Sequence, residues 1–164
     1  MKVWRKFVVA AVGALTLAGA GAVSVGAHEG GNLIEFDSMT PVGHPPTTER
    51  GIPGGGAAWS IISGSGEVDR QGHVSVTVHG LIVIQAGLNP INTFQVAVSC
   101  LKPDGTVTNV ITTGAPASTA GDSTINATVD LPHPCKDPVI FVGGSPRGSF
   151  IWFAMSNGQE EDND

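Results

Sequence analysis

The segment 59–84 most constrains the fold of this chain, because its side chains alternate between apolar and polar. Val74, Val76 and Val78 alternate with histidine, serine and threonine residues. This period of two is typical of a strand with one buried face and one exposed face. The motif DRQG at 69–72 opens with an aspartate and closes with a glycine, as a tight turn requires. The segment therefore predicts a β-hairpin.

The turn also predicts the register of this hairpin. A three-residue loop closed by Gly72 places Val68 opposite Val74 and Glu67 opposite Ser75. The upstream arm contains GSG at 64–66, where we expect a β-bulge, because interior glycines weaken and bend strands.

The rest of the chain repeats this design of short strands joined by turns. A second hairpin is predicted around KPDG at 102–105, with Val98 opposite Val110. Two near-continuous apolar runs, at 139–143 and 149–156, are typical of strands buried on both faces. The expected strands are 32–39, 59–68, 73–84, 92–101, 106–113, 124–131, 139–143 and 149–156. The Pro- and Gly-rich segment 40–57 and the segments 85–91, 114–123 and 132–138 are expected to be connections.

About eight strands at this spacing predict an all-β fold, an antiparallel β-sandwich. The likeness to immunoglobulin domains is one of architecture only, because Trp152 follows both Cys100 and Cys135 instead of lying between them.

The N-terminus has the features of a secretory signal peptide. Lys2, Arg5 and Lys6 precede an apolar stretch, and small residues follow it. We expect residues 1–27 to be removed by cleavage between Ala27 and His28, with cleavage after Ala20 as the alternative. An uncleaved membrane anchor is a second alternative, because the apolar stretch is just long enough to span a bilayer. The predicted organisation is a signal peptide at 1–27, a β-sandwich domain at 28–156 and an acidic disordered tail at 157–164.

The charge of the chain argues against nucleic acid as a partner. Removing residues 1–27 takes away three basic residues and no acidic ones, so the formal net charge moves from −6 to −9. A chain this acidic repels phosphate backbones. No later stretch is long and apolar enough to predict a membrane span.

The two cysteines, Cys100 and Cys135, are predicted to form a disulfide. An isolated pair in an exported chain is more often a disulfide than a metal site, and no C-x-x-C redox motif occurs. Cys100 shares its strand face with Phe94, Val96 and Val98, so we expect it to point inward.

No motif predicts catalytic, cofactor-binding or metal-binding residues. The G-x-S-x-G elbow and the H-E-x-x-H motif are both absent. The enzymatic alternative is a small metal-dependent or hydrolytic enzyme that uses His44 or His133 with a nearby acid. Two further pairs could be interpreted as glycosidase acids because each shares a strand face; they are Glu35 with Asp37 and Glu67 with Asp69.

The chain resembles uncharacterised exported bacterial proteins of this size. The resemblance is carried by NLIEFDSMTPV, GEVDRQGH, PASTAG, PHPC and the acidic end. It implies a secreted β-rich fold and no particular activity. We therefore expect a secreted, non-enzymatic module that binds an extracellular or cell-surface ligand through the loops at 40–57 and 114–123. The other alternative is a structural surface protein without a small ligand.

Overall fold

The computed structural model describes residues 31–157, and this part of the chain consists of strands and connections without a helix. Eight strands have five residues or more, and each corresponds to one of the eight predicted strands. They are β1 (Asn32–Phe36), β6 (Ser63–Asp69), β7 (His73–His79), β9 (Thr93–Leu101), β10 (Val107–Ile111), β12 (Ser123–Thr128), β13 (Lys136–Gly144) and β14 (Ile151–Ser156). The shorter strands are β2 (Met39–Pro41), β3 (Thr48–Glu49), β4 (Ile52–Pro53), β5 (Trp59–Ser60), β8 (Ile82–Val83) and β11 (Ala115–Pro116).

The predicted signal peptide at 1–27, its cleavage between Ala27 and His28, and nearly all of the predicted tail at 157–164 lie outside the described residues. Within residues 31–157, no helix has the length and apolar character needed to cross a membrane.

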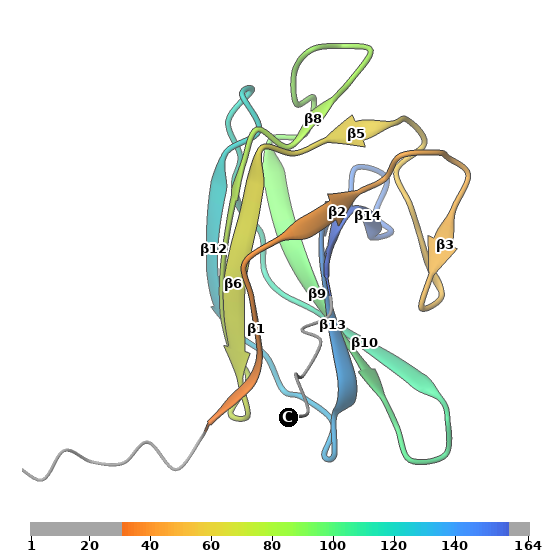
Figure 1. The fold of residues 1–164 in the computed structure, drawn as a ribbon, viewed down its shortest axis with the longest axis vertical. Coiled ribbons are helices and arrows are strands. Elements are labelled where there is room, and N and C mark those ends of the chain that lie inside the picture. The colour runs from red at the N-terminus through yellow and green to blue at the C-terminus, as the bar shows by residue number, and fades with distance from the viewer. Residues whose placement is uncertain (1–30, 158–164) are drawn as a thin grey trace, which may run out of the picture.

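Two antiparallel sheets pack face to face, which confirms the predicted β-sandwich (Figure 1). The first sheet has the order β1-β6-β7-β12. The second has the order β10-β9-β13-β14-β2, and β11 also pairs with β9. The predicted registers are confirmed: Val68 lies opposite Val74, Glu67 opposite Ser75, and Val98 opposite Val110.

The first sheet has one face exposed to solvent, whereas the central strands of the second sheet are buried on both faces. Val74, Val76 and Val78 of β7 are at most 3 % exposed, while the side chains between them face solvent. In β9, both Val98 and its neighbour Ser99 are fully buried. The alternation of β7 and the continuous apolar runs of β13 and β14 reflect this difference.

A third layer covers the outer face of the second sheet. The hairpin β3–β4 lies on the side of that sheet away from the first sheet (Figure 1). Gly54 bridges to Trp152, and the Trp152 ring packs against Phe141 with centroids 5.7 Å apart. Ile52 of β4 is only 5 % exposed. The segment 40–57, which was predicted to be a connecting loop, therefore contains β2, β3 and β4, because the second sheet has an apolar outer face that must be shielded from water.

Two local expectations are also wrong. The predicted long hairpin is interrupted: β5 and β8 pair with each other over the end of the core, where the Trp59 ring stacks on Phe153 at 4.0 Å. The register through 64–66 is regular, so GSG contains no bulge. Its glycines make room instead, because a Cβ at Gly66 would lie 2.4 Å from the Ser75 carbonyl oxygen and one at Gly64 would lie 2.7 Å from the Met39 side chain.

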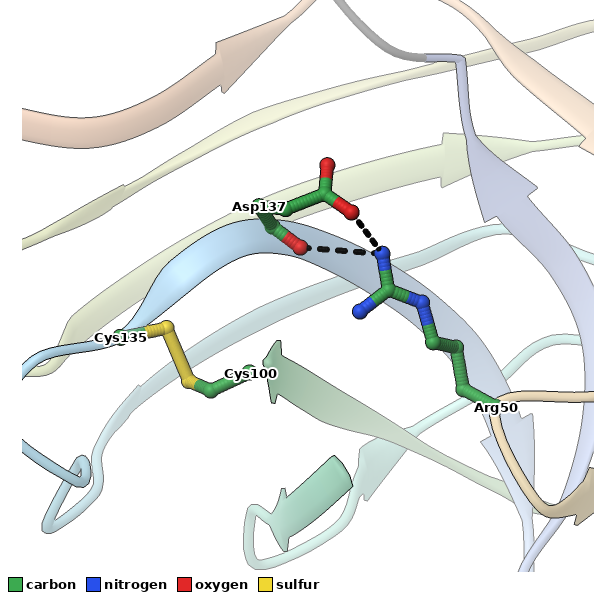
Figure 2. The surroundings of a disulfide bond; sticks show 4 residues. All are labelled: Arg50, Cys100, Cys135 and Asp137. Atoms are coloured by element: carbon green, nitrogen blue, oxygen red, sulfur yellow. Dashed lines mark hydrogen bonds and ion pairs between the residues drawn. A yellow bond between two sulfur atoms is a disulfide. The ribbon is translucent and has the colours of Figure 1, made fainter. Parts of the chain in front are cut away.

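The predicted disulfide is confirmed, and it holds the start of β13 against the end of β9. Cys100 and Cys135 are bonded, with their Cα atoms 4.8 Å apart, and Cys100 is fully buried. Close by, the Arg50 guanidinium forms an ion pair with the Asp137 carboxylate and donates to the Asp137 carbonyl oxygen at 3.1 Å (Figure 2). Arg50 lies in the β3–β4 turn, so this ion pair attaches the covering hairpin to β13.

Candidate functional site

Charged residues gather at one end of the sandwich. The turns at 69–72 and 102–106 and the connection at 129–138 contain seven charged side chains. These segments meet: the Val129 N–H donates to the Gly72 carbonyl oxygen, and Leu101 pairs with Lys136. The strand β1 begins at this end, with Asn32 opposite Asp69.

The opposite end has almost no charge. It is formed by the segments 54–63, 80–92, 114–121 and 145–150, which we call the low-charge end. Arg147 is the one charged residue in these segments. The adjacent Asp122, whose side chain is 49 % exposed, accepts a hydrogen bond from the Gly80 N–H at 3.0 Å and lies 3.4 Å from His79 Nδ1.

Asn89 fixes two of the segments of the low-charge end, 80–92 and 114–121, to each other. Its side chain donates to the carbonyl oxygens of Ser118 and Ile91, at 2.9 and 2.7 Å, and its Oδ1 accepts from the Ile91 N–H. Its backbone N–H donates to the Thr119 carbonyl oxygen. Asn89 is only 3 % exposed, so these bonds are shielded from water and the loop surface is preorganised. Asn89 was not predicted from the sequence, although the Asn-Pro dipeptide at 89–90 is a signal for a structured turn.

Three aliphatic side chains project from the low-charge end. Ile62 is 84 % exposed, Ile84 is 56 % and Leu88 is 44 %. They are three of the five large exposed hydrophobic residues in the described part of the chain. Single exposed apolar residues are ordinary, but several on one surface with little charge are typical of an interaction site.

A shallow groove of about 440 Å³ adjoins this surface. Its polar groups are the neutral side chains of Asn92, Thr93, Gln95 and Ser145, and Pro90, Ile91 and Pro146 supply apolar contact. The Ser145 hydroxyl donates to Gln95 Oε1 at 2.7 Å, and Gln95 Nε2 donates to the Thr112 carbonyl oxygen at 3.1 Å. The groove can therefore offer hydroxyl and amide hydrogen bonds without a formal charge.

No protein-family model, curated protein or solved structure matches this chain. The resemblance to exported bacterial proteins therefore stays a prediction, and the candidate site depends on the geometry alone.

The two histidines of the enzymatic alternative, His44 and His133, lie in different parts of the fold. His44 lies just after β2, near the beginning of β14, since the Val42 N–H donates to the Phe153 carbonyl oxygen. His133 precedes Cys135, at the other end of β9. Among residues 31–157, no three histidine, cysteine, aspartate or glutamate side chains are grouped closely enough to hold a metal ion.

The carboxylates are arranged differently from the pairs considered in the sequence. Glu35 lies opposite Glu67 across β1 and β6, and Asn32 Nδ2 donates to both carboxylates, at 3.2 and 3.1 Å. The Asp69 carboxylate instead forms hydrogen bonds within its own turn. Its Oδ1 accepts from the N–H groups of Gln71 and His73, and its Oδ2 lies 2.7 Å from His73 Nδ1.

Replacing Asp69 with asparagine is expected to lower the free energy of unfolding by about 1 kcal/mol near pH 7. Partial burial raises the pKa of the Asp69 carboxyl, but hydrogen bonds and the charge of His73 outweigh it, so the pKa lies below its ordinary value. A depressed pKa stabilises the fold above the unfolded-state pKa of about 3.9, and this contribution disappears as the pH falls through the folded-state pKa.

Urea denaturation from pH 7 to pH 2 measures this contribution. The difference between wild type and Asp69→Asn should shrink at acid pH. The control is Asp130→Asn, at an exposed aspartate of the same end of the molecule, which should change stability by less than about 0.5 kcal/mol. A difference between Asp69→Asn and wild type that is constant with pH would contradict the role of the carboxylate.

Proposed function

We propose that the protein is an exported, non-enzymatic β-sandwich module that binds an uncharged ligand at the cell surface or in the extracellular space. The ligand is held at the low-charge end. The observation that carries this proposal is the exposure of Ile62, Ile84 and Leu88 on loops with a single charged residue, in a chain of net charge −6. Loops on a rigid sandwich are the usual place for binding in such folds.

The proposed site differs from the pair of loops, 40–57 and 114–123, that the sequence predicted. Of the two predicted loops, 114–123 contributes to the low-charge end, through the bonds from Asn89 to Ser118 and Thr119. The segment 40–57 mostly covers the second sheet, and only its last residues reach this end. The connection 85–91, which was not proposed as a working part, supplies Leu88.

The chemistry of the surface favours a neutral ligand. The low-charge end offers amide and hydroxyl groups beside aliphatic side chains, which suits a polymer that carries hydroxyl and carbonyl groups together with apolar patches. Export is supported by the Cys100–Cys135 disulfide, because such bonds persist in oxidising compartments.

A thermal-denaturation screen tests the proposal. The purified protein is scanned with neutral soluble glycans, with cell-wall fragments, and with divalent metals in the presence and absence of a chelator. A ligand that binds the folded state stabilises it by about 2.7 kcal/mol at a hundredfold excess over its dissociation constant. We expect a saturable rise of the melting midpoint with a neutral polymer.

Matched variants then locate the site. Ile84→Asp and Leu88→Asp should weaken binding by about tenfold or more, because each places a charge on the contact surface. Asn126→Asp adds the same charge on the exposed face of the first sheet and should bind like wild type. A flat screen would favour the structural-protein alternative, and a shift with metals alone would favour the enzymatic one.

A further inference from the structure

The strand β10 forms an edge of the second sheet, and the backbone groups of three of its five residues point away from that sheet. Lys102 donates to the Thr106 carbonyl oxygen, and Thr112 donates to that of Val96. Because hydrogen-bonded and non-hydrogen-bonded pairs alternate in an antiparallel ladder, Thr108 and Val110 bond to β9. The N–H and C=O groups of Val107, Asn109 and Ile111 therefore face outward along the free edge.

Two aliphatic side chains of this edge strand are exposed. Val107 is 38 % exposed and Ile111 is 43 % exposed. They complete the five large exposed hydrophobic residues of the described part of the chain, and they lie on a different surface from the low-charge end. Figure 1 shows the β9–β10 hairpin projecting away from the body of the two sheets.

The other three edges of the sandwich have features that oppose strand pairing. β1 contains Glu35 and a register irregularity, and β2 is three residues long and ends in Pro41. β12 presents polar side chains and is followed by Asp130. Charges, prolines and irregularities at edges prevent association of sheets. β10 has no charged residue, no proline and no register irregularity. Its Asn109 side chain donates to the Arg50 carbonyl oxygen at 3.0 Å.

We propose that β10 is a dimerisation edge, which pairs antiparallel with β10 of a second copy across a two-fold axis at Asn109. In this register Val107 lies opposite Ile111 of the partner subunit, and Asn109 lies opposite its own counterpart. The three outward-facing residues of each copy form three hydrogen-bonded pairs, or roughly six backbone hydrogen bonds. The surface is self-complementary, as a two-fold interface requires.

The charge pattern favours a second copy over another partner. Lys102 and Asp104 lie in the turn before β10. The antiparallel arrangement places the turns of the two copies at opposite ends of the interface, so like charges stay apart. Aliphatic side chains face aliphatic side chains at both flanking positions, and such cross-strand pairs stabilise sheets.

Sedimentation analysis over about a hundredfold range of concentration tests the interface. Wild type should shift from monomer to dimer by mass action. Val107→Lys/Ile111→Lys should weaken association about a hundredfold, since edge lysines repel across this register. Ile84→Lys, at the low-charge end, is the matched control and should dimerise like wild type.

A charge swap tests the register itself. In Val107→Lys/Ile111→Asp, the ammonium group at position 107 faces the carboxylate at position 111 of the partner subunit, twice per dimer. Association should return to within about tenfold of wild type. Wild type that stays monomeric throughout, or a dimer unaffected by Val107→Lys/Ile111→Lys, would overturn the proposal. A charge-swapped variant as weak as the double-lysine variant would overturn the register.

Discussion

Loss of the Cys100–Cys135 disulfide is expected to lower the free energy of unfolding by about 4 kcal/mol. The bond joins residues 35 positions apart, and closing a loop of this length removes much of the conformational freedom of the unfolded chain. The loss is a large part of the stability of a typical domain.

The bond also positions the first residues of β13. Cys135 immediately precedes β13, and Asp137 receives the Arg50 ion pair on the outer face of the same sheet. Without the disulfide, the Arg50 contact and the pairing of Lys136 with Leu101 are left to hold this segment. We therefore expect the reduced protein to show faster hydrogen exchange at residues 135–137 than at the middle of β13.

Urea denaturation of the oxidised protein, the reduced protein and Cys100→Ala/Cys135→Ala measures the effect. The reduced protein and the double variant should be destabilised to a similar extent. Reducing agent added to the double variant is the control and should change nothing. A loss below about 1 kcal/mol on reduction would contradict the loop-closure account.

Replacement of Phe153 with alanine is expected to cost about 3–5 kcal/mol of stability. The Phe153 ring is 1 % exposed, stacks on Trp59 at 4.0 Å and meets Phe94 at 5.9 Å. These three rings join β14, β9 and the short strand β5, which closes the core beneath the low-charge end. Truncation leaves a cavity that the sheet backbone cannot collapse to fill.

Chemical denaturation and near-ultraviolet circular dichroism check this expectation. Phe153→Leu retains part of the buried volume and should lose less stability than Phe153→Ala. Ile62→Ala, at an 84 % exposed position, is the surface control and should stay within about 0.5 kcal/mol of wild type. A Phe153→Ala variant as stable as that control would show that the aromatic cluster contributes little.

The two proposals use separate surfaces and can fail separately. Ligand binding depends on Ile84 and Leu88 at the low-charge end, whereas dimerisation depends on Val107 and Ile111 of β10. A protein that binds ligand but stays monomeric would support the binding proposal and contradict dimerisation. A dimer that binds no ligand would do the reverse.

Local sequence patterns determined the strands, the tight turns and the disulfide of this protein. The alternation at 73–79 depends on side chains two residues apart, and the turns DRQG and KPDG depend on four residues each. Their registers follow from the turns alone. The inward direction of Cys100 follows from its place on the same strand face as Val96 and Val98. The eight long strands were therefore predictable.

Tertiary structure decided the arrangement of the segments without such a pattern. The Pro- and Gly-rich segment 40–57 has no alternation, and its place over Phe141 and Trp152 depends on an apolar sheet face built from β9, β13 and β14. The break in the first hairpin depends on Phe153, which offers Trp59 a stacking partner far along the chain. The low-charge end is formed by four separate segments. Asn89 joins two of them, because its side chain bonds to Ser118, which lies 29 positions further along the chain. Contacts at such separations depend on strand order, which local alternation and turn chemistry do not specify.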